Sequence, residues 1–274
     1  MLRFILSHAF WAAVCAAALV IETTLLAGLP LQPALPVFVF FATCCSYNFH
    51  FAIAKIYTLP PAQLTAATLP ASNILCIIIA FLGMVLCYPY AGTGITHIAV
   101  AALCTLLYSL PLLPLQKIVF IRRAGFIKTL LLAFTWTYVT AYLPMVAAAV
   151  EINIPAVLLL LQRFVFMLLL CIIFDQRDVH TDAVKGFHSL ATDLTARATQ
   201  RLLYILFAVL ALIHIALFYF ALGTSQSAAL MLALAATLIV YRMSVQRQRG
   251  FVFYYFLVDG LMLLSAVLTI MASI

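Results

Sequence analysis

The chain has 274 residues, of which 68% are hydrophobic and 8% are charged, and its mean hydropathy is +1.23. A water-soluble domain of this length has too little interior to bury so many apolar side chains, which argues against a soluble globular protein. The formal net charge is +7, but the basic residues are scattered singly and do not gather with aromatic residues on one face. We therefore expect no nucleic-acid partner and a membrane environment instead.

Apolar windows of about 20 residues, the length at which a helix crosses a bilayer, recur along the whole chain. Backbone groups in hydrocarbon must pair within the protein, and windows of this length favour helices over the short alternating strands of a barrel. The expected fold class is all-α, a polytopic membrane protein with a single domain over residues 1–274. The nine predicted spans are residues 8–28, 35–54, 69–88, 95–114, 126–148, 155–174, 202–222, 226–241 and 251–273.

The basic residues indicate how these helices are oriented. Short cytoplasmic loops collect Lys and Arg. Every Lys and Arg other than Arg163 falls in the N-terminal tail or in the segments that follow the second, fourth, sixth and eighth windows, if Lys128 near the start of the fifth window is counted with the segment before it. We therefore expect a cytoplasmic N-terminus and an external C-terminus, in the cytoplasmic membrane of a bacterium.

Three charged residues lie deep inside predicted spans: Glu22, Arg163 and Asp259. An unpaired charge there costs roughly 3 kcal/mol or more, so each is expected to have a partner. Arg163 and Asp259 lie at similar depths, roughly 16 and 13 Å from the inner ends of their helices, which allows them to pair. Glu22 lies deeper and either joins them or is protonated. A structural lock is the favoured interpretation, and a transport or proton pathway is the alternative.

An acidic cluster follows the sixth window. Asp175, Asp178 and Asp182 are spaced i, i+3 and i+7, which places them on one helical face. Adjacent carboxylates repel one another unless a cation lies between them, and Mg²⁺ binds carboxylates together with phosphate oxygens. The pattern therefore fits a diphosphate site; the alternative is a solvated loop whose acids pair with Arg177 and neighbouring basic residues.

The segment from Phe174 to Thr192 resembles the second aspartate motif of the UbiA superfamily of intramembrane prenyltransferases, which reads D-x-x-D-x-x-x-D followed by a basic residue and Gly. Tyr108-Ser-Leu-Pro111 is similar to the Tyr-Ser/Thr-x-Pro segment of that family. The basic residues Lys117, Arg122 and Arg123 are similar to its basic loop between the fourth and fifth helices. The resemblance covers nearly the whole chain and implies a nine-helix UbiA-type bundle with its acidic motifs at the cytoplasmic ends of the second and sixth helices.

The resemblance implies a function as well as a fold. A UbiA-like enzyme would transfer an isoprenoid from a prenyl diphosphate to a hydrophobic acceptor, such as an aromatic one, with Mg²⁺ as cofactor and membrane lipids as surroundings. Asp175, Asp178 and Asp182 would be the catalytic metal ligands. The expected substrate-binding residues are Asn48, His50, Tyr108, Lys117, Arg122, Arg123 and Lys185.

The first aspartate motif of the family, N-D-x-x-D-x-x-x-D, is degenerate in this chain. Asn48 matches the motif, but Phe49, Ala52 and Ile56 occupy the three acidic positions. Three interpretations follow: a single-metal enzyme in which Asn48, His50 and Lys55 replace lost ligands or positive charge; an enzyme that acts on a different headgroup; or a noncatalytic isoprenoid- or lipid-binding relative. A small transporter is a further alternative.

Overall fold

The computed structural model describes residues 5–6, 8–58, 71–109, 125–185, 190–246 and 249–274, except for the side chains of 54–58, 109, 125, 178 and 180–185. Every element in these ranges is helical. The long helices are α2 (Phe10–Leu26), α3 (Ala34–Thr58), α4 (Ala71–Cys87), α5 (Ile95–Ser109), α7 (Gly125–Thr137), α9 (Ile154–Lys185), α11 (Ala196–Phe220), α12 (Thr224–Gln246) and α13 (Asp259–Ser273). The short segments are η3 (Tyr88–Tyr90), η6 (Tyr138–Tyr142), α8 (Leu143–Ala147), α10 (Leu190–Asp193) and η7 (Phe253–Val258).

These helices agree with the predicted spans, and the all-α, polytopic fold class is confirmed. Seven helical segments in the described ranges are long and apolar enough to cross a membrane, and two further apolar helices, α2 and α5, are shorter. The number of nine spans and the orientation in the membrane stay predictions.

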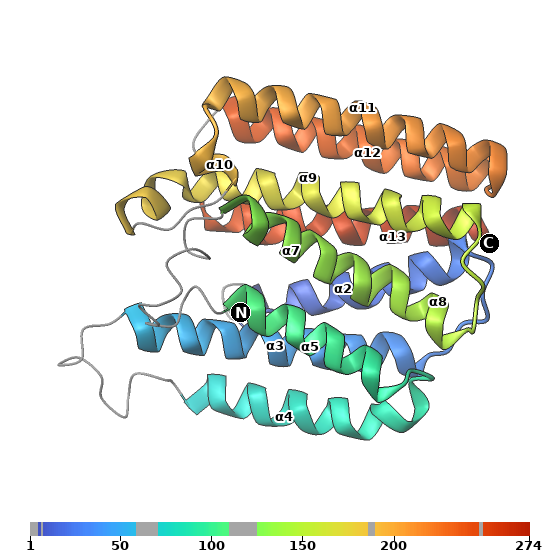
Figure 1. Cartoon of the computed structure of the whole chain (residues 1–274), viewed down its shortest axis with the longest axis horizontal. Coiled ribbons are helices and arrows are strands. Elements are labelled where there is room, and N and C mark those ends of the chain that lie inside the picture. Colours follow the sequence, from blue (N-terminus) through green and yellow to red (C-terminus); the bar gives the residue numbers. More distant parts are fainter. Residues whose placement is uncertain (1–4, 7, 59–70, 110–124, 186–189, 247–248) are drawn as a thin grey trace.

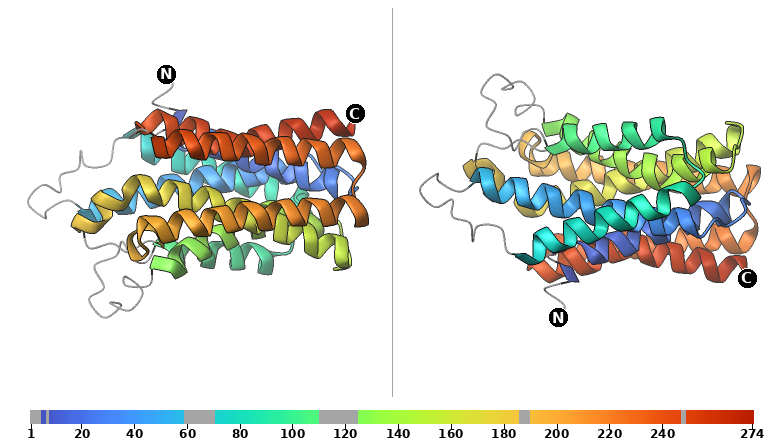
Figure 2. Two further views of the ribbon diagram at one scale, coloured as in Figure 1. Left: turned by 90° about the horizontal axis from the view of Figure 1, so that it is seen from above. Right: turned by 90° about the horizontal axis from the view of Figure 1, so that it is seen from below.

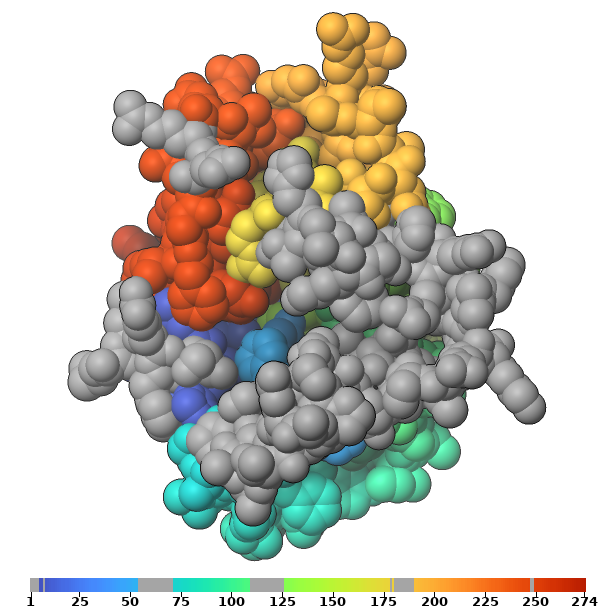
Figure 3. Space-filling model, turned by 90° about the vertical axis from the view of Figure 1, so that its left-hand side faces the viewer, coloured from blue at the N-terminus to red at the C-terminus, as the bar shows by residue number. Residues whose placement is uncertain are grey.

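The helices run side by side along one axis of the molecule (Figure 1). Helices α3, α5, α9 and α12 end at the same end of the bundle, and the C-terminus lies at the opposite end (Figure 2). Lys128 near the start of α7, Arg201 near the start of α11 and Arg242 near the end of α12 all belong to the first of these ends. We call it the basic end; Figure 3 looks onto it, with α9 in yellow and α3 in blue near the centre.

Helix α9 lies in the centre of the bundle, and its middle stretch is apolar on every side. Each residue from Val165 to Ile173 is buried. A helix that is hydrophobic all round is expected inside a bundle, since a surface helix needs only one apolar stripe. Asn153 accepts a hydrogen bond from the backbone N–H of Ala156 and so caps the start of α9.

Helix α4 lies at the periphery and contacts the bundle through α3. Ala80 is its buried residue, while most of its other side chains face outward. Gly83 allows the close approach, because a Cβ at this position would lie 2.6 Å from Cδ1 of Phe41 on α3. The outward-facing apolar surface of α4 suits a lipid environment.

The intramembrane charges pair differently from the sequence-based expectation. Arg163 on α9 forms an ion pair with Glu22 on α2, with 2.7 Å between Nη2 and Oε2. The predicted pairing of Arg163 with Asp259 is therefore wrong, because depth along a helix does not specify which neighbour a side chain faces. Asp259 instead lines a cavity.

Three hydroxyl groups contact the buried pair. Ser265 and Thr269 on α13 both donate hydrogen bonds to Oε1 of Glu22. Arg163 donates to Oγ1 of Thr23 at 3.1 Å, and Thr23 in turn donates to the backbone carbonyl of Thr140 in the π-helical segment η6. The network joins α2, α9, α13 and η6, as a structural lock would.

Candidate functional site

A cavity of about 600 Å³ lies among α3, α5, α7, α9 and the η7–α13 segment, and its lining is mostly apolar. Such a volume is typical of small-molecule sites. Its charged side chains and histidine are His50, Lys128, Asp175, Arg177 and Asp259. Three tyrosines, Tyr47, Tyr108 and Tyr255, also line it.

Asp175 brings the predicted acidic motif to this cavity. The motif lies on α9 itself, which continues to Lys185 beyond the predicted window, rather than in a loop. Buried Thr129 on α7 donates a 2.6 Å hydrogen bond from Oγ1 to Oδ2 of Asp175. A hydroxyl that fixes one carboxylate oxygen orients the other, as partners around metal-binding carboxylates do.

The other residues of the motif are placed only by their backbone. Asp178 and Asp182 follow Asp175 on the same continuous helix, so the i, i+3, i+7 spacing does describe one helical face. The side chains of Asp178, Asp182 and Lys185, and the whole of Lys117, Arg122 and Arg123, lie outside the described residues. Among the side chains that are described, no group of three His, Cys, Asp or Glu residues could hold a metal ion.

The position of the degenerate first motif is apolar and aromatic. Asn48 is fully buried and does not line the cavity; its Nδ2 donates to the backbone carbonyls of His8 and Cys44, both at 2.8 Å. The expected substrate-binding role of Asn48 gains no support from this placement, because a side chain fixed between two backbone carbonyls is directed toward helix packing. Phe49 lies on the cavity wall at the next position.

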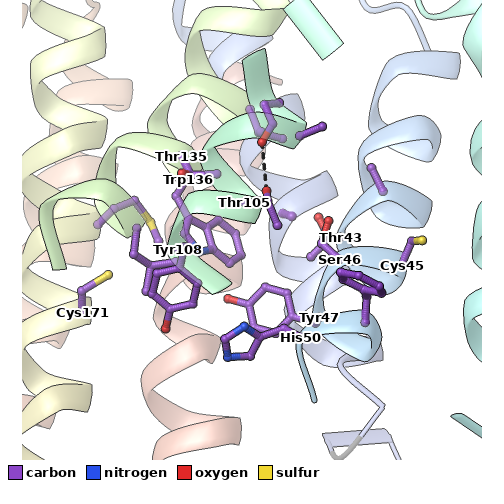
Figure 4. Close-up of a pocket in the computed structure, with 18 of the residues that line it drawn as sticks. Thr43, Cys45, Ser46, Tyr47, His50, Thr105, Tyr108, Thr135, Trp136 and Cys171 are labelled. Atoms are coloured by element: carbon purple, nitrogen blue, oxygen red, sulfur yellow. Dashed lines mark hydrogen bonds between the residues drawn. The ribbon is translucent and has the colours of Figure 1, made fainter. Parts of the chain in front are cut away.

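His50 and Tyr108, two of the expected substrate-binding residues, line the cavity. Their rings are stacked, with centroids 5.2 Å apart, and Tyr47 and Trp136 lie beside them (Figure 4). Lys128 lies with Nζ 5.5 Å from the centroid of the Tyr108 ring. From the sequence, Lys128 was only one of the basic residues that indicate how the helices are oriented in the membrane. In the structure its side chain lines the cavity.

Arg177 is a second cation in the cavity wall, and from the sequence it was expected only to pair with the neighbouring acidic residues. Its guanidinium carbon lies 4.8 to 5.7 Å from the ring centroids of Phe174, Tyr254 and Tyr255. Its Nη2 also donates to the hydroxyl of Tyr255 at 3.5 Å. Its position between Asp175 and Asp178 was the signal in the sequence, since both neighbours belong to the acidic motif.

The architecture is similar to two solved structures. The apo structure of a UbiA homolog from Aeropyrum pernix K1 aligns over 95% of this chain and 96% of its own, with a TM-score of 0.58 and 16% identity. The structure of a digeranylgeranylglyceryl phosphate synthase aligns over 97% of each chain, with a TM-score of 0.54 and 12% identity. The chain has a UbiA-type fold.

The resemblance predicted from the acidic motif is thereby confirmed for the fold. No protein-family model and no curated protein sequence matches the chain. Because identities this low speak only for the architecture, the chemistry of this UbiA-type bundle has to be argued from its own cavity.

Proposed function

We propose that this UbiA-type protein binds a prenyl diphosphate together with Mg²⁺ and transfers the isoprenoid to a hydrophobic acceptor within the membrane. The observation that carries the proposal is the composition of the cavity. Two carboxylates, Asp175 and Asp259, and two cations, Lys128 and Arg177, line a cavity whose wall is otherwise mostly apolar and aromatic. This combination matches an amphiphile with an anionic head and a hydrocarbon tail.

The head of the substrate would lie toward the basic end of the cavity. Lys128 lies near the start of α7 and Arg177 near the end of α9, so both cations belong to this end. Guanidinium and ammonium groups bind phosphate oxygens well, and they are more effective where water is largely excluded. The tail would extend past residues such as Leu132, Val139 and Met262.

The acidic residues fit a magnesium ion by the chemistry of their donor atoms. Asp175 presents a carboxylate to the cavity, and Asp178 and Asp182 follow on the same helical face. Hard carboxylate oxygens together with phosphate oxygens are the ligands that Mg²⁺ prefers. When bound, the ion would supply positive charge to the diphosphate.

The side chains of this chain would then assist the departure of the diphosphate. The allylic carbon–oxygen bond breaks, the electron pair leaves with the diphosphate, and Lys128 and Arg177 stabilise the growing negative charge. Tyr47, Trp136 and Tyr108 present aromatic rings to the cavity, and such rings stabilise a nearby carbocation. Lys128 and Arg177 also offer positive charge that lessens the need for a second metal at the degenerate first motif.

A noncatalytic isoprenoid-binding protein is the second candidate, and Phe49 favours it. This residue occupies the first acidic position of the degenerate motif and lines the cavity, where a phenyl ring cannot ligate a metal. Such a protein would retain the tail-binding cavity and would not release diphosphate.

Binding and turnover separate the two candidates. Binding of geranylgeranyl diphosphate to detergent-purified protein would be measured with and without Mg²⁺ in the wild type, in Asp175→Asn and in the control Glu151→Gln, whose exposed side chain lies between α8 and α9. Mg²⁺-dependent binding that is lost only in Asp175→Asn supports the diphosphate site. Release of diphosphate with a membrane lipid extract as the source of acceptor identifies an enzyme; binding without release identifies the noncatalytic protein. Absence of binding in the wild type overturns both.

A further inference from the structure

Arg201 on α11 and Arg242 on α12 are exposed cations that do not line the cavity. The two helices pack against each other along one side of the bundle (Figure 1). Arg201 follows the start of α11 at Ala196 by five residues, and Arg242 precedes the end of α12 at Gln246 by four. At a rise of 1.5 Å per residue, both arginines lie about 6 to 8 Å inside the basic end of their helices. They therefore share one level along the bundle.

A contact between two tyrosines relates the positions of these arginines. Tyr204 on α11 and Tyr241 on α12 meet edge to face, with ring centroids 6.0 Å apart. Arg201 lies three residues before Tyr204 and so shares its helical face, and Arg242 directly follows Tyr241. The two cations therefore flank the line along which α11 packs on α12.

The surface of the hairpin changes from cationic to apolar at this level. Toward the helix ends, Arg197 adds a third exposed cation one turn before Arg201. Toward the middle of the bundle, the exposed side chains on the two helices are aliphatic, among them Ile205, Leu212, Leu232 and Ile239. A cationic band above an aliphatic surface is the pattern expected where a membrane protein meets lipid heads and then lipid tails.

The two arginines are not used inside the protein. Neither Arg201 nor Arg242 forms a hydrogen bond, an ion pair or a ring contact with another residue that the structure describes. Arg249 shows the contrast: its Nε donates to the backbone carbonyl of Met243 at 2.9 Å, and its guanidinium carbon lies 5.2 Å from the centroid of the Phe253 ring. Arg201 and Arg242 therefore present two guanidinium groups to an external anion.

We propose that an anionic phospholipid binds to the α11–α12 hairpin, with its phosphate between Arg201 and Arg242 and its acyl chains along the aliphatic surface. Guanidinium groups match phosphate oxygens in charge and geometry, and clustered basic residues on the cytoplasmic side of membrane helices are typical sites for anionic lipid heads. Tyr204, which is exposed at the same level, suits the boundary between heads and tails. The site lies outside the cavity and does not depend on prenyl transfer.

Native mass spectrometry of the detergent-purified protein tests the site. The protein would be titrated with phosphatidylglycerol and with phosphatidylcholine of the same acyl chains. One basic residue near an anionic lipid contributes about fivefold in affinity, so two arginines should give the wild type a preference of roughly 25-fold for phosphatidylglycerol. Arg201→Gln and Arg242→Gln should each lower this preference to about fivefold, and the double variant should show none. Arg3→Gln removes the same charge from the N-terminal tail and should keep the wild-type preference.

Three results would overturn the proposal. The first is equal affinity of the wild type for the two lipids, and the second is a preference that survives in Arg201→Gln/Arg242→Gln. The third is a loss in Arg3→Gln as large as that in Arg201→Gln, because net charge rather than a site would then account for binding. Should the double variant unfold in a thermal unfolding assay, the two single variants decide.

Discussion

Arg163 on α9 and Glu22 on α2 form an ion pair of 2.7 Å in the centre of the bundle, where their side chains are 1% and 0% exposed. Breaking such a pair leaves one uncompensated buried charge, which typically costs about 3–5 kcal/mol. Removing both charges together avoids this cost. The pair therefore specifies how α2 and α9 pack mainly because either charge alone would be costly to bury. The net attraction between the two charges contributes less.

The single variant Arg163→Met should accordingly lower the free energy of unfolding by about 3–5 kcal/mol, because Glu22 would lose its cation. The double variant Glu22→Met/Arg163→Met should lie closer to the wild type. Thermal unfolding in detergent measures both. Losses that simply add in the double variant would show that the two side chains do not stabilise one another.

Thr129→Val should weaken Mg²⁺-dependent binding of geranylgeranyl diphosphate by roughly tenfold, because Asp175 would lose the hydroxyl that orients its carboxylate. Thr129→Ser keeps a hydroxyl at this position and should bind nearly as the wild type does. A magnesium titration at fixed ligand concentration provides the comparison. If the valine and serine variants behave alike, the hydroxyl has no orienting role.

Lys128→Met should weaken binding of the diphosphate, whereas Lys128→Arg should largely retain it, because the proposed role is positive charge at the head of the substrate. Tyr108→Phe keeps the ring that lies against His50 and Lys128 and is expected to be nearly neutral. The same binding assay with geranylgeraniol, which lacks the diphosphate, supplies a control. An equal loss for the alcohol and the diphosphate in Lys128→Met would contradict a charge-based role.

Gly83→Ala should destabilise the packing of α4 on α3 by about 1–3 kcal/mol, because the added Cβ would lie 2.6 Å from the Phe41 ring. Phe40 packs edge-on against this ring, with centroids 5.4 Å apart. Gly223→Ala is the matched control, as nothing lies within 4 Å of a Cβ there. Unfolding temperatures of the two variants, and of Gly83→Ala combined with Phe41→Leu as a rescue, test the packing.

The C-terminus is expected outside the cytoplasm. An alkaline phosphatase fused after Ile274 should be active in a bacterial host, and a green fluorescent protein fused at the same point should be dark. A reporter inserted after Gln246 at the end of α12 should give the reverse pattern, since this segment belongs to the basic end. Fluorescence from the C-terminal fusion would contradict the predicted orientation.

The sequence by itself determined the helices and the class of fold. The length of each apolar window is a local property of the sequence, and a window of about 20 apolar residues is stable in lipid as a helix. Each predicted span therefore coincides with a helix in the described ranges. The UbiA-type architecture was likewise predictable, because the segment from Phe174 to Thr192 resembles the second aspartate motif of that superfamily.

Only the tertiary structure decided which side chains meet. Depth along a helix suggested Arg163 and Asp259 as partners, but helix rotation and the order of neighbours bring Arg163 to Glu22 and leave Asp259 in the cavity wall. The same rotation directs Asn48 to backbone carbonyls and turns Lys128 toward the cavity. These orientations depend on packing between segments far apart in the sequence, to which composition and spacing along one helix give no access.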